Sequence, residues 1–295
     1  MYTGDYYAVA SALVWSFAVI LMRVAGYQIP PVALTFFKSS VALFLLVITL
    51  FILQEPLLLD LSGWDYFRLI ISAVVGISIA DTMVAASLNR LGASLQALAD
   101  CAYTPTITIL GFVMFGEMLS AWEIMGGLLV VSGVFVGAVM KTTAATKKDI
   151  MIGIALAATA HAIMGAGILI VRDIYREESV IWVTGFRFLA AVVAMAIFGA
   201  IKYPGNLKTT LLLGFYRTDM WRTMIPMAIL GPFLATLFWI AGFKYLEAGR
   251  AAIYNQMSTA FIILLAYFFL GEKLTARKFL GVVLALSGAL LVATH

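Results

Sequence analysis

The sequence predicts an all-α integral membrane protein with ten transmembrane helices arranged as two inverted five-helix repeats. Three observations carry this prediction: the composition, a succession of long apolar runs, and a set of short motifs that recurs in the second half. Of the 295 residues, 63% are hydrophobic and 12% are charged. A soluble domain averages about 45–50% apolar and about 25% charged residues, so this chain has too little polar surface to be solvated in water.

The composition also excludes several classes of protein. Cys101 is the sole cysteine, and the histidines are His161 and His295, so we expect no disulfide, no metal site and no cofactor. The net charge of +4 comes from basic residues placed between apolar runs, where they orient a chain in the bilayer. We therefore expect the lipid bilayer, and no nucleic acid, as a partner.

Ten apolar runs have about the 20 residues that a helix needs to span a bilayer. They are continuously apolar rather than alternating, which excludes the strands of a transmembrane barrel. In chain order the runs are Tyr6–Ala25, Pro31–Leu53, Phe67–Asn89, Ala93–Phe115, Ala121–Met140, Ile150–Val171, Ser179–Ile201, Thr223–Leu246, Gly249–Leu270 and Ala276–Ala293.

One polar break, Lys141–Lys148, has the composition of a linker and lies close to the middle of the chain. It predicts a first five-helix repeat over residues 1–140, a linker over 141–148 and a second repeat over 149–295. Because each repeat holds an odd number of helices, the second must lie upside down relative to the first. Such inverted repeats are typical of secondary transporters, whose substrate site lies near the midplane between the copies.

Short motifs match between the two halves at a nearly constant offset along the chain. The matching pairs are Gly116-Glu117 with Gly271-Glu272, Ser132-Gly133 with Ser287-Gly288, Arg23 with Arg172, and Phe37-Lys38 with Phe186-Arg187. With a Gly-Glu pair after the fourth and ninth helices and a Ser-Gly pair late in the fifth and tenth, the chain resembles the EamA-type branch of the drug/metabolite transporter superfamily. The resemblance covers nearly the whole chain. It implies a small-molecule substrate, a bacterial inner membrane and a cavity lined by helices 1, 3, 4, 6, 8 and 9.

Charged residues and a histidine at membrane depth, away from the ends of the predicted spans, mark the candidate site. They are Lys38, Asp81, Asp100, His161 and Arg187. A charge at the bilayer centre costs about 2.5–3.5 kcal/mol, so such residues face a cavity or a partner. At a rise of about 1.5 Å per residue, the first three reach a similar depth from one membrane face.

We expect Lys38 to pair with one of the two aspartates, which leaves the other to titrate or to bind a cationic group. The alternative is a fixed ion-pair network that only holds helices together. Arg187 either binds a substrate carboxylate or extends to the membrane interface. His161 is either a packing residue or a proton relay.

Polar and aromatic residues interrupt the apolar runs where the fourth and ninth helices begin, which predicts the walls of the site. Together with the resemblance, this gives the candidate substrate-binding or coupling residues Lys38, Asp81, Gln96, Asp100, Tyr103, His161, Arg187, Trp239, Asn255 and Gln256.

The predicted function is secondary-active transport that exports or exchanges a small metabolite by alternating access. An amino acid suits a site with both acidic and basic groups, and a proton is a candidate coupling ion. No nucleotide-binding motif is present, so a gradient or exchange would drive transport. The alternatives are an intramembrane aspartyl protease, whose Gly-x-Gly-Asp motif is missing, and a non-transporting membrane scaffold. We therefore expect no enzyme activity, and a monomer or a weak homodimer.

The orientation in the membrane stays open at this point. The loops at the face opposite the termini carry twelve basic residues against five at the other face, which predicts that both termini lie outside. Similar transporters have cytoplasmic termini, so the two indications disagree.

Overall fold

The computed structural model describes residues 3–93, 96, 100, 103–138, 146–271 and 274–294, and this part of the chain is helical with no strand. Seven helices in it are long and apolar enough to cross a membrane, namely Thr3–Ala25, Pro31–Ile52, Gly63–Leu91, Lys148–Leu169, Val180–Lys202, Thr218–Tyr245 and Ala248–Leu270. Three shorter apolar helices are Thr106–Phe115, Ala121–Gly133 and Phe279–Val292. The chain is therefore an integral, multi-pass membrane protein. Most of the predicted linker, residues 141–145, lies outside the described residues.

Seven of the predicted apolar runs overlap the seven candidate spans, and the other three overlap the shorter apolar helices. The first half contains α1 (Thr3–Ala25), α2 (Pro31–Ile52), α3 (Gly63–Ala73), the π-helical η1 (Val74–Ile79), α4 (Ala80–Leu91), α6 (Tyr103–Phe115) and α7 (Ala121–Ala138). The second half contains α8 (Lys147–Leu169), α9 (Arg172–Glu177), α10 (Val180–Lys202), α11 (Leu207–Thr210), α12 (Leu213–Tyr216), the 3₁₀-helical η3 (Thr218–Met220), α13 (Trp221–Ala228), the π-helical η4 (Ile229–Ala235), α14 (Thr236–Tyr245), α15 (Ala248–Asn255), α16 (Met257–Leu270) and α17 (Ala276–Thr294).

Local sequence explains where several helices begin and end. Ser62, Thr146 and Ser179 accept a backbone N–H at the starts of α3, α8 and α10, which satisfies donors that the helix itself cannot. Gly116 and Gly271 follow α6 and α16 with φ of 68° and 67°, a left-handed conformation that glycine adopts without strain. The glycine of the repeated Gly-Glu motif therefore repeats in backbone conformation as well as in sequence.

The predicted spans Phe67–Asn89 and Thr223–Leu246 are interrupted by the π-helical segments η1 and η4. The number of residues that separates the start of η1 from the start of η4 equals the number that separates the two Gly-Glu motifs. Gly76 and Gly231 therefore occupy matching positions in the two segments. A π-helical turn inserts one residue into the helix and is common at functional sites. An apolar run alone does not reveal it, because the side chains on either side remain apolar.

The predicted ninth span, Gly249–Leu270, is two helices rather than one. Helix α15 ends at Asn255 and α16 begins at Met257, with Gln256 between them. In the predicted fourth span, Ala93–Phe115, helix α6 begins at Tyr103 and Asp100 is in a 3₁₀ turn, while residues 94–95, 97–99 and 101–102 lie outside the described residues.

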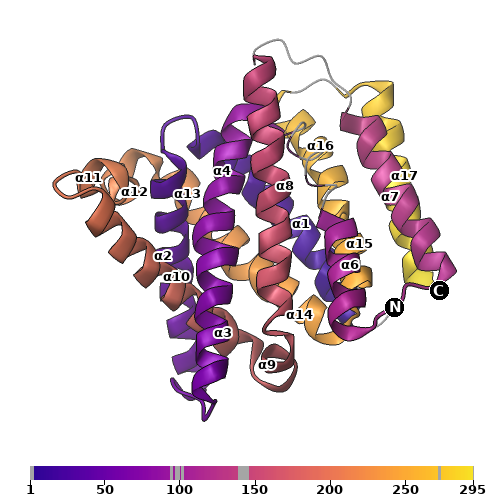
Figure 1. Cartoon of the computed structure of the whole chain (residues 1–295). Helices are drawn as coiled ribbons and strands as arrows, with labels where there is room; N and C mark the ends of the chain where they lie inside the picture. The colour runs from indigo at the N-terminus through magenta and orange to yellow at the C-terminus, as the bar shows by residue number, and fades with distance from the viewer. Residues whose placement is uncertain are drawn as a thin grey trace.

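The first helix of each half packs against the other half. Helix α1 contacts α13, η4, α14, α15 and α16, whereas α8 contacts α3, η1, α4 and α6. Figure 1 shows α7 and α17 side by side at one edge of the molecule and α11 and α12 at the opposite edge. Helices α7 and α17 approach closely, since a Cβ added to Gly288 would lie 2.4 Å from the Gly126 carbonyl oxygen.

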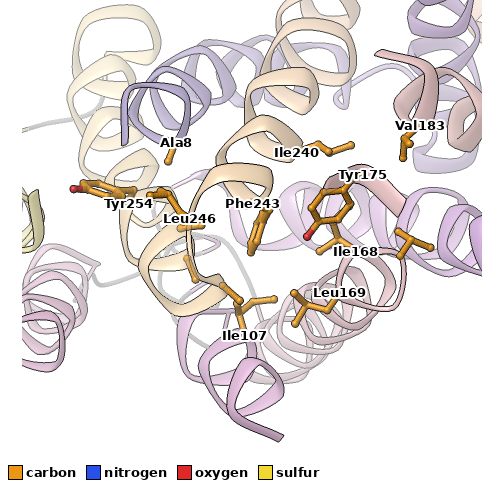
Figure 2. Close-up of a cluster of buried hydrophobic side chains, with 14 of the residues drawn as sticks. Ala8, Ile107, Ile168, Leu169, Tyr175, Val183, Ile240, Phe243, Leu246 and Tyr254 are labelled. Carbon is orange, nitrogen blue, oxygen red and sulfur yellow. The ribbon is translucent and has the colours of Figure 1, made fainter. Parts of the chain in front are cut away.

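The largest buried apolar cluster joins the two halves. It brings Ile107 of α6 together with Ile168 of α8, Tyr175 of α9, and Phe243 and Leu246 at the end of α14 (Figure 2). Lipid tails are as apolar as these side chains, so the cluster stabilises the fold through close packing rather than through removal from water.

Candidate functional site

A cavity of about 120 Å³ lies among the central segments of the helices of both halves. One water needs about 10–15 Å³ by this measure, so the cavity has room for several waters or a small organic molecule. Nine of the ten predicted site residues line it, namely Lys38, Asp81, Asp100, Tyr103, His161, Arg187, Trp239, Asn255 and Gln256. Ser11, Trp15, Gly76, Thr236 and Ser258 are among the other lining residues.

The tenth predicted residue, Gln96, lines a smaller adjoining pocket together with Met22 and Leu88. Asp100 and His161 border both pockets. The Gln96 Nε2 atom donates to Asp100 Oδ1 across 3.5 Å, a long hydrogen bond. The smaller pocket therefore extends the cavity toward the ends of α1 and α4 that lie beside Arg23.

Lys38 on α2 pairs with Asp81 on α4. The Lys38 Nζ atom lies 2.5 Å from Asp81 Oδ2, and the two side chains are 2% and 12% exposed. The ammonium group also lies 5.9 Å from the centre of the Trp15 ring. The Lys38 charge is thus neutralised inside the protein.

Asp100 is held from two elements. Its Oδ1 atom lies 3.3 Å from His161 Nδ1 on α8, and its backbone carbonyl accepts a hydrogen bond of 2.7 Å from the Gln256 side chain. The same His161 nitrogen lies 2.9 Å from the Ala157 carbonyl oxygen. Both neighbours are acceptors, so Nδ1 is the nitrogen that carries a proton. His161 therefore faces the cavity with a carboxylate beside it.

Tyr103 connects the aromatic residues of the cavity wall. Its hydroxyl accepts a hydrogen bond of 3.0 Å from Trp239 Nε1 and also bonds the Asn255 side chain. Its ring meets the His161 imidazole edge to face, with 5.8 Å between the centres. The aromatic wall is thereby fixed in orientation next to the Asp100 carboxyl group.

Arg187 on α10 also lines the cavity and does not extend to the membrane interface. The residue is 1% exposed, and its Nε and Nη2 atoms have no hydrogen-bond partner among the described residues. A Cβ on Gly76 would lie 3.2 Å from Arg187 Nη2, so the guanidinium packs directly against the glycine of η1. A buried guanidinium with two unbonded nitrogen atoms is able to bind an anionic group.

Two further buried ion networks were not expected from the sequence. Arg172 of α9 pairs with Glu117, whose Oε2 atom accepts the Ala248 backbone N–H at 2.8 Å. Arg250 of α15 lies 3.2 Å from Asp5 Oδ1 and 3.4 Å from Glu123 Oε1.

Arg172 and Arg250 are two of the five basic residues assigned above to the face of the termini, and both are buried rather than solvated. The positions of Glu123 and Arg250 inside predicted spans were the signal that could have revealed the second network.

Near the first network, desolvation and the carboxylates of Glu117 and Glu123 raise the pKa of Glu247.

The comparisons with known proteins agree with this architecture. The model of the EamA-like transporter family matches residues 2–138 and 151–294. A solved structure described as "Crystal structure of protein" superposes with a TM-score of 0.79 at 16% identity, covering 99% of this chain and 96% of that chain, which shows a shared fold. No curated protein matches the sequence. Because the family model matches both halves, the chain belongs to the EamA-like transporter family and is a membrane transporter of the drug/metabolite type.

Proposed function

We propose that the protein is a secondary-active transporter that exports or exchanges a small metabolite such as an amino acid by alternating access. One observation carries the proposal: a central cavity between the halves holds the Asp100 carboxyl group and the Arg187 guanidinium in the same lining. An amino acid carries one charge of each sign, so the two groups offer a partner to each end of a zwitterion. Trp15, Tyr103 and Trp239 supply apolar surface for its side chain.

The proposed architecture is ten spans in two inverted five-helix repeats. Its support is the recurrence of local structure at matching positions, which includes the π-helical segments and the left-handed glycines. Arg23 donates to the carbonyl oxygens of Leu88 and Asn89, and Arg172 donates to that of Leu246. Each arginine thus binds the carboxyl end of the third span of its own half. Two copies with equivalent parts can exchange conformations, which is the basis of alternating access.

Proton coupling is proposed at Asp100 rather than at Asp81. Asp81 has a lysine at 2.5 Å, whereas Asp100 faces His161, which is charged only when protonated. In proteoliposomes with a pH gradient, Asp100→Asn is expected to abolish substrate-dependent proton movement while exchange of substrate for substrate continues. Unchanged acidification by Asp100→Asn would remove Asp100 from this role.

Counterflow tests the transport proposal directly. Liposomes containing the purified protein are loaded with one unlabelled amino acid at a time and diluted into the same labelled compound at trace level. We expect at least one amino acid to accumulate transiently and in a saturable manner above protein-free liposomes. Flux that rises linearly with concentration would indicate a channel, and no flux for any amino acid would exclude this substrate class.

The protease alternative has no support in the site. Aspartyl proteases use two carboxyl groups that share a proton. Here Asp81 contacts Lys38 and Asp100 contacts His161, so each carboxyl group has its own basic neighbour.

For a multi-pass protein of this family we propose residence in a bacterial inner membrane.

A further inference from the structure

Arg187 differs from the other charged residues that line the cavity. Lys38 and Asp81 form an ion pair, and Asp100 lies beside His161. Arg187 has no ion pair among the described residues, and two of its nitrogen atoms lack any hydrogen-bond partner there. Burying a charge without a counter-ion is strongly unfavourable. A buried charge without an ion-pair partner in a cavity wall therefore indicates a role in binding another group.

The repeat shows what is missing beside Arg187. Lys38 and Arg187 occupy matching positions in the two halves, and the position that matches Asp81 is Thr236. Thr236 lines the cavity and donates its hydroxyl to the Gly231 carbonyl oxygen at 3.4 Å. A hydroxyl cannot neutralise a guanidinium, so the second half has the cation of the pair without its carboxylate.

Arg187 is a lining residue of the cavity, and its guanidinium packs against η1. Gly76 lies next to Arg187 Nη2, and any larger side chain there would crowd it. Arginine presents parallel N–H groups that match the two oxygens of a carboxylate. The unpartnered Nε and Nη2 atoms lie on one edge of the guanidinium and form such a fork.

We infer that Arg187 is the anchor for a substrate carboxylate, which takes the place that Asp81 occupies beside Lys38. This inference rests on the proposed function for the claim that the bound molecule is transported. It specifies the substrate class further: a carboxylate is required, and amines or amides of the same shape are poor substrates.

The first experiment measures the thermal stability of the purified, ligand-free protein. Arg187→Met removes the unpaired charge, and Thr236→Asp supplies a counter-ion from within the chain. Both variants are expected to raise the unfolding midpoint by about 2 °C or more. Thr236→Asn is the neutral control of the same shape and is expected to leave the midpoint unchanged. A lower midpoint for Arg187→Met would show that Arg187 is a structural residue and would overturn the inference.

The second experiment uses sodium propionate as the probe, with propionamide plus sodium chloride at equal ionic strength as the comparison. Propionate is expected to raise the midpoint of the parent protein by about 2 °C, because it binds only the folded state. Arg187→Met and Thr236→Asp should lose this increment, whereas Arg90→Gln, a change at an exposed arginine, should retain it. Equal stabilisation by propionamide, or stabilisation by inorganic phosphate alone, would contradict a carboxylate site.

These measurements need no flux, so they separate the inference from the proposed function. Counterflow of an amino acid with no effect of propionate or of Arg187→Met would leave the transporter proposal standing and refute the anchor. Stabilisation by propionate without counterflow of any amino acid would support the anchor and refute amino-acid transport.

Discussion

Buried charges in this protein belong to two kinds that have different consequences when a residue is replaced. Those in ion pairs stabilise the arrangement of helices, because removal of one partner leaves the other charge buried without a counter-ion in a medium of low polarity. Lys38 with Asp81 and Arg250 with Asp5 are of this kind. Arg187 is of the other kind, since among the described residues it forms no ion pair and its Nε and Nη2 atoms have no hydrogen-bond partner.

The contrast makes a prediction for the Lys38–Asp81 pair. Lys38→Met leaves the Asp81 carboxylate alone and should destabilise the protein by about 3–5 kcal/mol, whereas the double variant Lys38→Met with Asp81→Leu should recover most of the loss. The measurement is the unfolding midpoint by heating and size-exclusion chromatography. If the double variant were as unstable as the single one, the loss of stability in Lys38→Met would not come from the unpaired Asp81 carboxylate, and the prediction would be wrong.

At this scale the sequence was informative where charge and depth sufficed. The depths of Lys38, Asp81 and Asp100 along their helices indicated that they face one region, and the structure pairs Lys38 with Asp81. The sequence could not choose between the two aspartates, because helix rotation decides which carboxylate faces the lysine. The Arg172–Glu117 and Arg250–Asp5 pairs were missed because charges near span ends are usually solvated.

Among the elements, the π-helical segments connect backbone geometry to the site. Segment η1 places Gly76 beside Arg187, and η4 places Gly231 where an added Cβ would lie 3.0 Å from the Ala18 Cβ atom. Apolar composition predicted an all-helical membrane protein, and seven of the predicted spans correspond to helices long and apolar enough to cross a bilayer. It could not locate these turns or the break at Gln256, because they depend on tertiary packing against the other half.

Gly76→Ala tests the link between η1 and the site. The added methyl group would crowd Arg187 Nη2 at 3.2 Å, so the guanidinium must shift. We expect the apparent KM for counterflow of a transported amino acid to rise about tenfold, with a midpoint of unfolding within about 2 °C of the parent. Gly63→Ala is the matched control, because a Cβ there meets nothing within 4 Å. An equal change in both variants would refute a specific effect at Arg187.

Across the whole molecule, buried contacts join the two halves at both ends of the bundle, and an ion pair is part of the contact at the end that carries α9. Arg172 connects the second half to Glu117 of the first, and it donates to the Leu246 carbonyl oxygen beside the apolar cluster of Figure 2. At the other end, Arg23 bonds only residues of its own half in the contacts described, and the Gln28–Arg217 bond between halves is exposed. The smaller pocket also extends toward that end. The two ends therefore differ in the kind of contact. The α9 end has a buried ion pair, whereas at the other end the Ser87 hydroxyl donates to the Gly153 carbonyl oxygen and a second apolar cluster includes Leu88 and Met224.

Opening of the transporter at the α9 end must break the Arg172–Glu117 ion pair, which gives a prediction for access to the cavity. In a Cys101→Ser background, Ser258→Cys places a thiol in the cavity lining, and a membrane-impermeant thiol reagent reports access from the α9 side. Glu117→Gln keeps an oxygen for the Ala248 N–H but removes the charge that Arg172 binds. A loss of about 1.4 kcal/mol from the closed state would raise the labelling rate about tenfold.

Arg68→Gln is the control for the labelling experiment, because its ion pairs with Asp65 and Asp173 lie at the same end but are partly exposed. Surface ion pairs contribute little, so we expect its labelling rate to match the parent. A cysteine at the exposed Gly63 position identifies the α9 face in sealed vesicles and so determines the orientation that charge counting left open. If Glu117→Gln and Arg68→Gln changed the rate equally, closure would depend on general surface charge. If neither did, the apolar cluster alone would close this end.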